Sequence, residues 1–450
     1  MLAAALLSML SCGIYKKYER PEGCVSDGLF GYQVADSSSI ADFGWEELFT
    51  DPYLDSLISR ALDRNTDIRT AMLNVDKAEA ALKTARLDFL PSFNFAPQGS
   101  AGGFNNFSSL NTGASWTYTV PVAASWEIDV FGKKTNRLRS AKVSLNMADD
   151  YAQAAKSALI AGIARQYYTL LMLDEQLRIA GATADKFRQS VEVLSAMCDA
   201  GMSNEAAVSS MRAAIYEVEA AKESILQAIT EVENSLCSTL FETPHSIERG
   251  ILDDAAFPEE LKTGVPAALL SRRPDVRAAE NALAASYYAV NIARASLYPS
   301  LSLSGTAGWT NSLGSSVVNP SGLILNAAAS LLQPIFNAGA LRAQVRIARD
   351  EQEAAELAFR QCILNAGTEV NNALSLYQRA CARIECRERQ IEAQKDAVEK
   401  TELLMRFSSN TYLEVLTAEQ SLLSAENAMT QDRFDRINAV ISLYHALGGM

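Results

Sequence analysis

The chain has 450 residues and a formal net charge of −13 at pH 7, from 40 basic and 53 acidic side chains. An acidic balance without clustered Lys and Arg argues against nucleic-acid binding, because phosphate recognition depends on a gathered basic surface. The sequence holds two histidines, His245 and His445, and seven cysteines that form no CxxC pair. These counts leave little material for a metal site or for general-base chemistry, so we expect neither an enzyme nor a cofactor.

The first residues form an apolar run that ends at Cys12. The run is too short to cross a bilayer, but it fits the apolar region of a secretory signal. Cys12 follows the small residue Ser11, as the acylated cysteine of a bacterial lipoprotein does; the alternative is an ordinary signal peptide with an incidental cysteine. We therefore expect a signal peptide over residues 1–11, lipidation of Cys12, and an extended tail over residues 12–44.

Residues 45–88 have a helical pattern that restarts at Asp51-Pro52, because proline favours the first turn of a helix. After Phe89 the pattern alternates, which predicts a first strand, and a Gly- and Ser-rich loop is expected over residues 99–113. Residues 115–130 alternate most regularly of all. This segment predicts a long strand whose apolar face carries Trp116, Tyr118, Val120, Val122, Ala124, Trp126, Ile128 and Val130.

Two long stretches without proline, residues 133–200 and 340–407, predict helices on the order of 100 Å long. Each is followed by a returning helix, over residues 204–241 and 412–447. Two further strands are predicted at about residues 300–309 and 323–333, after a helix that begins at Arg272-Arg273-Pro274-Asp275.

A duplication relates the two halves of the chain. Asp67 stands 24 residues before Pro91, and Asp275 stands 24 residues before Pro299, so the two pairs are offset by 208 residues. A repeat that contains both helical and strand segments predicts one architectural unit in two copies. We expect these copies over residues 45–241 and 265–450, joined by an irregular connector over residues 242–264.

The predicted architecture is an α+β membrane channel with four amphipathic strands and two long helical hairpins in each chain. No later stretch is apolar and long enough for a membrane-spanning helix, so a crossing of the bilayer would need β-structure. Four strands cannot close a barrel, and closed membrane barrels begin at about eight strands. Several chains must therefore pool their strands, giving eight in a dimer or twelve in a trimer.

Five motifs resemble those of the TolC-like outer-membrane efflux family, and most closely its acylated branch, which serves resistance-nodulation-division pumps. They are RRPDVRAAE at 272–280, ARASLYPSL at 293–301, QPIFNAG at 333–339, YLEVLTAEQ at 412–420 and YHALGG at 444–449. The resemblance covers nearly all of the chain after Trp45.

The resemblance implies a homotrimer with a twelve-stranded outer-membrane barrel and a periplasmic tunnel of twelve helices. It implies a membrane-fusion adaptor and a proton-driven inner-membrane pump as partners, outer-membrane lipid as the surroundings, and passive conduction of drugs or other small molecules. The protein would be lipid-anchored in the outer membrane, with its helical part in the periplasm. No nucleic acid is expected as a partner.

In this family, acidic residues just after the second hairpin turn ring a periplasmic aperture. The matching residues are Tyr412, Glu414 and Thr417, with Thr417 standing where many relatives carry a second acid. A carboxylate at a constriction would favour cations and disfavour anions. The alternative is that Thr411 and Glu414 form a capping box, in which Glu414 only closes a helix N-terminus.

The resemblance places the adaptor contact at the tips of the hairpins, and turn chemistry alone accounts for some of these residues. The tip residues are Gly201, Ser203, Ser408, Ser409, Asn410 and Thr411. A rival interpretation is a surface-anchored coiled-coil adhesion lipoprotein without a pore. It explains the helices but not the strands that recur at the same place in both halves.

Overall fold

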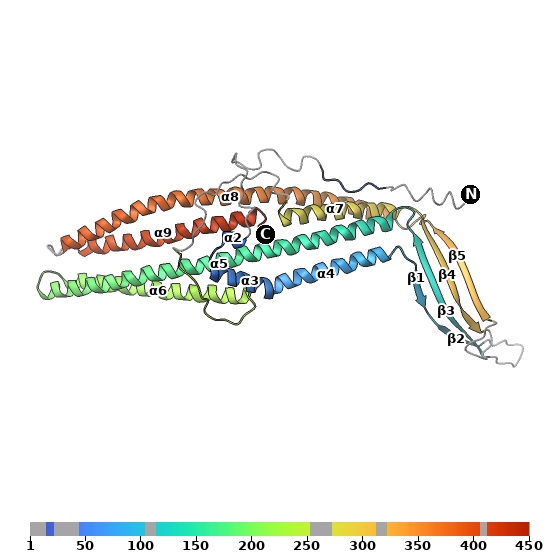
Figure 1. Cartoon of the computed structure of the whole chain (residues 1–450), viewed down its shortest axis with the longest axis horizontal. Helices are drawn as coiled ribbons and strands as arrows, with labels where there is room; N and C mark the ends of the chain where they lie inside the picture. Colours follow the sequence, from blue (N-terminus) through green and yellow to red (C-terminus); the bar gives the residue numbers. More distant parts are fainter. Residues whose placement is uncertain are drawn as a thin grey trace. The chain divides into compact units, whose positions relative to one another are not determined.

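The computed structural model describes residues 15–21, 45–103, 114–252, 272–311, 322–405 and 412–449. The chain divides into two compact units, each of which draws on both halves of the sequence (Figure 1). The strand unit comprises Met1–Glu22, Asn74–Asp149 and Ala278–Phe359. The hairpin unit comprises Gly23–Leu73, Asp150–Arg277 and Arg360–Met450. Cys12 lies outside the described residues.

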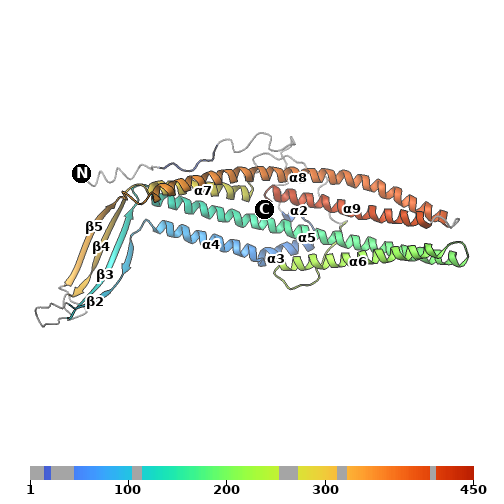
Figure 2. The same ribbon diagram turned by 180° about the vertical axis from the view of Figure 1, so that it is seen from behind.

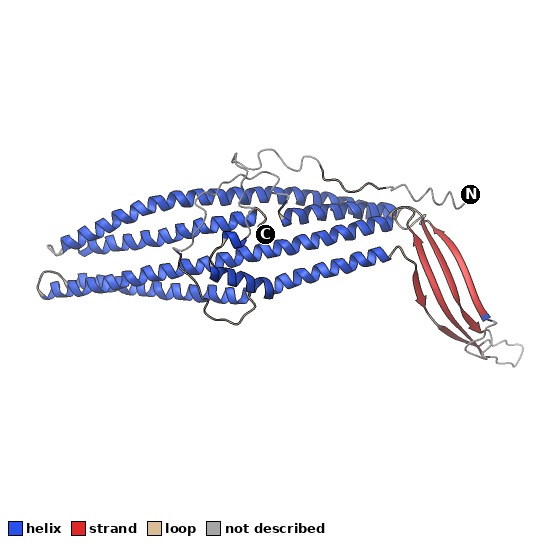
Figure 3. Cartoon of the chain, viewed as in Figure 1, coloured by secondary structure: helices blue, strands red, loops and turns tan. Residues whose placement is uncertain are grey.

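The strand unit contains one antiparallel sheet (Figure 3). Its strands are β1 (Ser92–Phe95), β2 (Gln98–Gly103), β3 (Ala114–Ile128), β4 (Ser300–Asn311) and β5 (Leu323–Leu332). The order is β1-β3-β4-β5, and β2 also pairs with β3. Since β1 and β2 follow each other along the same edge of β3, the sheet has four strand positions, as the sequence predicts.

One strand falls where a loop was expected. Residues 98–103 pair with residues 114–119 as β2, so the prediction of a loop from Gly99 onwards was wrong for these residues. The break between β1 and β2 contains Pro97, which has no backbone N–H to donate to a neighbouring strand. The Gly- and Ser-rich composition of β2 has low intrinsic strand propensity, and pairing with β3 overrides it.

Strand register brings the predicted apolar positions onto one face. Val120 pairs with Trp309 and Trp126 pairs with Leu303 across β3 and β4. The opposite face is polar, as the pairing of Ser125 with Ser304 shows. Gly308 is required within this sheet, because a Cβ there would lie 2.4 Å from the carbonyl oxygen of Val120.

The helices agree closely with the sequence pattern (Figures 1 and 2). They are α2 (Trp45–Leu48), α3 (Pro52–Arg64), α4 (Thr66–Leu87), α5 (Lys133–Asp199), α6 (Glu205–Thr239), α7 (Pro274–Ala295), α8 (Ala340–Met405) and α9 (Tyr412–Ala446). A break at Asn65 was not predicted; its Oδ1 accepts hydrogen bonds from the backbone N–H groups of Asp67 and Ile68. Among the described helices, none is both long and apolar enough to cross a bilayer.

Helix lengths confirm the duplication. Helices α4 and α7 each have 22 residues, α6 and α9 each have 35, and α5 and α8 have 67 and 66. Gly132 and Gly339, just before α5 and α8, both have positive φ, at 71° and 80°. Because glycine adopts this conformation without steric cost, the two positions make the same turn from strand to helix.

The endings of α6 and α9 match as well, but with different residues at the turn. Gly448 has φ 83°, and Phe241 occupies the corresponding position with φ 58°. After α6 the N–H of Glu242 donates to the carbonyl of Cys237; after α9 the N–H of Gly449 donates to that of Tyr444. These bonds satisfy carbonyls at the end of each helix. A phenylalanine here is strained, because L-residues with a Cβ disfavour the left-handed region.

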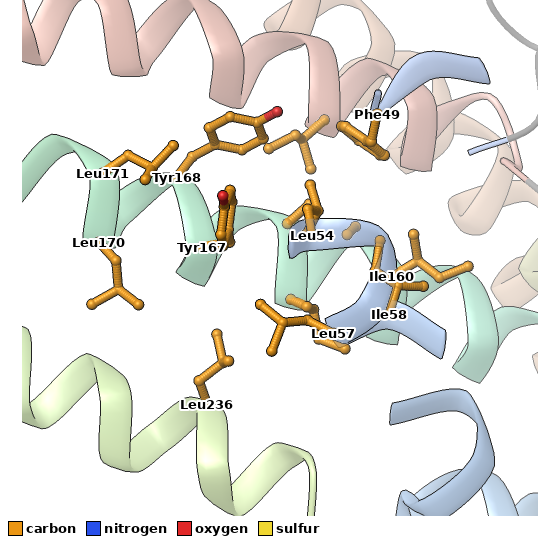
Figure 4. Packing of buried hydrophobic residues seen from close by; sticks show 14 of the residues in the cluster. Phe49, Leu54, Leu57, Ile58, Ile160, Tyr167, Tyr168, Leu170, Leu171 and Leu236 are labelled. Atoms are coloured by element: carbon orange, nitrogen blue, oxygen red, sulfur yellow. The ribbon is translucent and has the colours of Figure 1, made fainter. Parts of the chain in front are cut away.

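The largest core among the described residues lies in the hairpin unit, where α3 packs against α5 and α6 (Figure 4). Leu54, Ile58 and Leu170 are fully buried there. Tyr167 is also fully buried; its hydroxyl donates to Asp51 Oδ2 at 2.5 Å and accepts from the Gly250 N–H at 3.0 Å. This hydroxyl therefore joins the start of α3 to α5 and to the segment that follows α6.

Arg273 fixes the end of α9 in the same unit. Its side chain is 5% exposed and donates to the Ala446 carbonyl, at 2.8 Å, and to the carboxylates of Asp275 and Glu369, both at 2.7 Å. Although burial opposes ionisation, the Arg273 guanidinium holds the pKa of Asp275 below its usual value. The charged sequence before α7 thus has a structural role, in addition to beginning that helix.

Candidate functional site

The turn between α5 and α6 is formed by its own backbone. Gly201 has φ 73°, its N–H donates to the Cys198 carbonyl at 2.9 Å, and the next N–H, of Met202, donates to Met197 at 2.8 Å. This pair of bonds is the Schellman ending of a helix, which needs a left-handed residue at the position of Gly201. Asn204 then caps α6, with its side chain accepting from the Ala207 N–H at 2.9 Å.

Ser203, between the Schellman ending of α5 and the Asn204 cap of α6, is half-buried. Its hydroxyl oxygen is buried and has no hydrogen-bond partner among the described residues. Gly201 and Ser203 thus lie in the turn where the sequence places them. The corresponding residues of the second hairpin, Ser408, Ser409, Asn410 and Thr411, lie outside the described residues.

The three predicted aperture residues lie in the first turns of α9. Tyr412 is half-buried and packs against an apolar cluster, whereas Glu414 is exposed. Thr417 is exposed too, and its hydroxyl donates to the Leu413 carbonyl of its own helix at 2.7 Å. Glu414 and Thr417 therefore lie on an accessible face, and Tyr412 anchors the start of the helix.

The same apolar cluster joins the two hairpins. Phe187 of α5 and Met211 of α6 are fully buried beside Met405 of α8 and Val415 of α9. Arg188 links α5 to α6 by an ion pair with Glu219. Packing of α5 and α6 against α8 and α9 thus sets where Glu414 stands.

Helix α9 also carries a buried acid, Glu419, that the sequence pattern did not predict. Glu419 is 4% exposed, and it follows the buried residues Val415 and Leu416 at helical spacing. Burial, and then the charge of Glu402, raises the pKa of Glu419 to about 7. The available signal was an acidic residue at a position where the helical repeat of buried residues predicts an apolar side chain.

The sequence profile of the Outer membrane efflux protein family matches residues 57–240 and 265–449. The chain belongs to this family. Its two matched segments correspond to the two halves seen in the helix lengths. The family consists of channels, so the protein is an outer-membrane transport protein rather than an enzyme, and its helical part lies in the periplasm.

Similar proteins cover almost the whole chain. The cation efflux system protein CusC of Escherichia coli (strain K12) is 28% identical over 449 residues, which are 98% of this chain and 97% of CusC. The pyoverdine export outer membrane protein OpmQ of Pseudomonas aeruginosa (strain PAO1) is 28% identical over 459 residues, covering 100% of this chain and 96% of OpmQ.

Solved structures show the same fold. A crystal structure of CusC superposes with a TM-score of 0.89 at 28% identity, over 98% of this chain and 100% of that one. The open state of the MtrE outer membrane channel of Neisseria gonorrhoeae gives 0.86 at 27% identity, over 97% and 98%. The outer membrane efflux protein described here therefore has the TolC-like fold, mostly helical with a four-position sheet in each chain, as expected.

Proposed function

We propose that three copies of this chain assemble into the outer-membrane channel of a tripartite efflux pump, each copy contributing its sheet to one twelve-stranded barrel. One observation carries this proposal: among the described residues the sheet is open at both edges, and its edge strands carry large exposed apolar side chains. Phe93 on β1 is 70% exposed, and Leu331 on β5 is 70% exposed. Open edges of this kind are not tolerated in lipid, so another sheet must pair with them.

The two faces of the sheet support the same assembly. The face with Val120, Trp126 and Trp309 would meet lipid, and the face with Ser125 and Ser304 would line the bore. Membrane barrels have this apolar-out, polar-in alternation. A coiled-coil adhesion protein without a pore would have no use for a polar sheet face opposite an apolar one.

The hairpin unit would form the periplasmic tunnel. We propose that the tips around Gly201 and Ser203, together with residues 408–411, contact a membrane-fusion adaptor, and that the pump is of the resistance-nodulation-division type. The residue ranges 45–241 and 265–450 would be the two copies of an ancestral repeat, joined by residues 242–264. Residues 1–11 would be removed as a signal, leaving a tail to residue 44 anchored in the membrane by lipid on Cys12.

Cargo selection would rest with the pump, because the channel only conducts. CusC is named for cation efflux and OpmQ for pyoverdine export, so similar channels serve chemically different substrates. We propose passive conduction of small molecules without binding of a cofactor or nucleotide.

At the aperture we propose that Glu414 interacts with passing ions. Its exposure on the first turn of α9 supports this role, and the capping alternative places the same side chain at the helix N-terminus. Substitution of Glu414 by Gln separates the two, since a ring carboxylate sets ion preference and a cap sets helix stability.

The test is single-channel recording of the purified full chain in planar bilayers. The channel account predicts stable conductance, with cation preference reduced in Glu414→Gln but unchanged in Glu217→Gln, an exposed acid on α6. Conductance with unaltered selectivity in Glu414→Gln would remove Glu414 from the aperture. Absence of conductance in every preparation that retains the native helical content would contradict the channel itself.

A further inference from the structure

Glu419 is a buried acid without a partner. Both carboxylate oxygens are buried, and neither accepts a hydrogen bond from a described residue. An ionised carboxylate in this state is strongly unfavourable, because it has given up water and gained no donor. The side chain must therefore be compensated, either by a proton or by a cation that is not part of the chain.

Glu419 is one of the residues that line a groove on the hairpin unit. The groove lies between α5, α8 and α9, and its volume is about 520 Å³. A smaller hollow of about 270 Å³ adjoins it, since Lys186, Lys395, Glu419 and Leu422 line both. The volume of the larger hollow lies within the range in which proteins bind small organic molecules, roughly 300–1,000 Å³.

The walls of the groove are partly apolar. Val193 from α5, Val398 and Met405 from α8, and Leu422 from α9 line it together with Glu419. An apolar wall beside a single deeply placed charge is a combination that suits an amphipathic ligand, because the wall takes the hydrocarbon part and the charge fixes its orientation.

The charges around the groove favour a cation. Lys395 pairs with Glu426 at 3.7 Å, and Arg178 pairs with Glu175 at 2.7 Å, so these two basic groups are already matched.

The third basic side chain that lines the groove is Lys186 on α5, and the lining also contains the carboxyl groups of Glu399 and Glu402 on α8 and Glu419 on α9. No ion pair joins Lys186 to Glu419 within the described structure, and Lys186 is exposed. Three carboxyl groups against one ammonium group leave the groove acidic.

We infer that this groove binds a small organic amine, whose ammonium group pairs with the Glu419 carboxylate while its hydrocarbon part packs on Val398, Met405 and Leu422. A metal ion is disfavoured, because the described residues contain no group of three His, Cys, Asp or Glu side chains that could hold one. Every residue involved belongs to the hairpin unit of one chain.

The protonation state of Glu419 gives the site a defined pH dependence. Burial, then Glu402, raises the pKa of Glu419 to about 7, while Lys186 opposes the shift. An amine with an ordinary pKa of about 10 stays charged throughout the neutral range. Binding should therefore weaken about tenfold between pH 8 and pH 6, as the carboxylate takes up a proton.

The test uses the full chain in lipid nanodiscs, with 4-phenylbutylamine as the probe and isothermal titration calorimetry at pH 8 as the measurement. We expect the wild type to bind the amine and Glu419→Gln to bind it at least about tenfold more weakly. The isosteric control Glu217→Gln on α6 should bind like the wild type. Lys186→Gln should bind more tightly, because it removes the competing ammonium group.

The neutral analogue 4-phenylbutanol distinguishes charge recognition from partition into the apolar wall or the lipid. Equal binding of alcohol and amine, or equal binding by the wild type and Glu419→Gln, would overturn the inference. Binding of a trilysine peptide through Glu419, without binding of the amine, would also overturn it in favour of a protein side chain as ligand. Conductance measured on the same Glu419→Gln sample shows whether the channel is intact, so failure of the site and failure of the channel are separate results.

Discussion

The clearest structural prediction concerns Arg273, which connects the start of α7 to the end of α9. Arg273→Met keeps a long side chain with an apolar stem but removes the guanidinium N–H groups that donate hydrogen bonds to Asp275, Glu369 and the Ala446 carbonyl. Breaking a fully buried ion pair costs about 3–5 kcal/mol. The two carboxylates are 43% and 51% exposed and regain water, so we expect a smaller loss, about 2–3 kcal/mol.

This loss should appear locally, as faster opening of the last turns of α9. Since 1.36 kcal/mol corresponds to a factor of ten, amide exchange over residues 440–449 should accelerate about 30- to 150-fold. Hydrogen-exchange mass spectrometry of the full chain measures this directly. Arg273→Lys retains the charge and should be intermediate, and Arg389→Met, at an exposed position on α8, should leave the segment unchanged. Unchanged exchange in Arg273→Met would refute the account of this anchor.

Three further predictions test other parts of the hairpin unit. Phe241→Gly should stabilise the fold by about 1 kcal/mol because it removes the strain of a left-handed non-glycine residue, and Gly448→Ala should destabilise it by about 1–2 kcal/mol. Chemical denaturation followed by circular dichroism of the helices measures both changes in the free energy of unfolding. Changes of the same sign would contradict the matched helix endings. Tyr167→Phe should cost about 1–2 kcal/mol by the same measurement, through loss of the bonds to Asp51 and Gly250, and a neutral result would show that this hydroxyl does not hold α3 in place. Glu419→Gln should stabilise the protein by about 3 kcal/mol at pH 8 and have little effect near pH 4.5. The reason is that a carboxyl whose pKa is raised from 4.5 to about 7 contributes stability below pH 4.5, and this stability is lost as the pH rises through 7. Measuring the free energy of unfolding at both pH values tests this, and an equal effect at both would be inconsistent with the raised pKa.

Much of the fold could be predicted because its signals are local. Glycine marks the starts of α5 and α8 and the ends of α5 and α9, and proline marks the starts of α3 and α7. Helices α5, α6, α8 and α9 have the bounds that the pattern predicts within about two residues. The alternation in β3 identifies its apolar and polar faces. Because the chain is duplicated, the helices and strands predicted in one half can be compared with those predicted in the other. Strand β2 was missed because its Gly- and Ser-rich sequence becomes a strand only by pairing with β3.

The site was less predictable, for a different physical reason. Gly201 shows its turn in sequence, since a left-handed ending favours glycine. Neither the exposure of Glu414 nor the burial of Glu419 is a local property, because α5 and α6 pack on α9 from more than a hundred residues away in sequence. An acid inside an apolar stripe was visible in the sequence, but only packing shows that it lacks a partner. The roles of Cys12, of Tyr412, Glu414 and Thr417, and of residues 408–411 stay predictions.

One chain has too little sheet to close a barrel, so we propose that it shares a barrel with copies of itself. Native mass spectrometry of the full chain, extracted from outer membranes in mild detergent, measures the number of copies directly. We expect a complex of three chains, with closure of the sheet through its β1 and β5 edges. A folded species that remains a single chain across the detergents and concentrations tested would contradict the account.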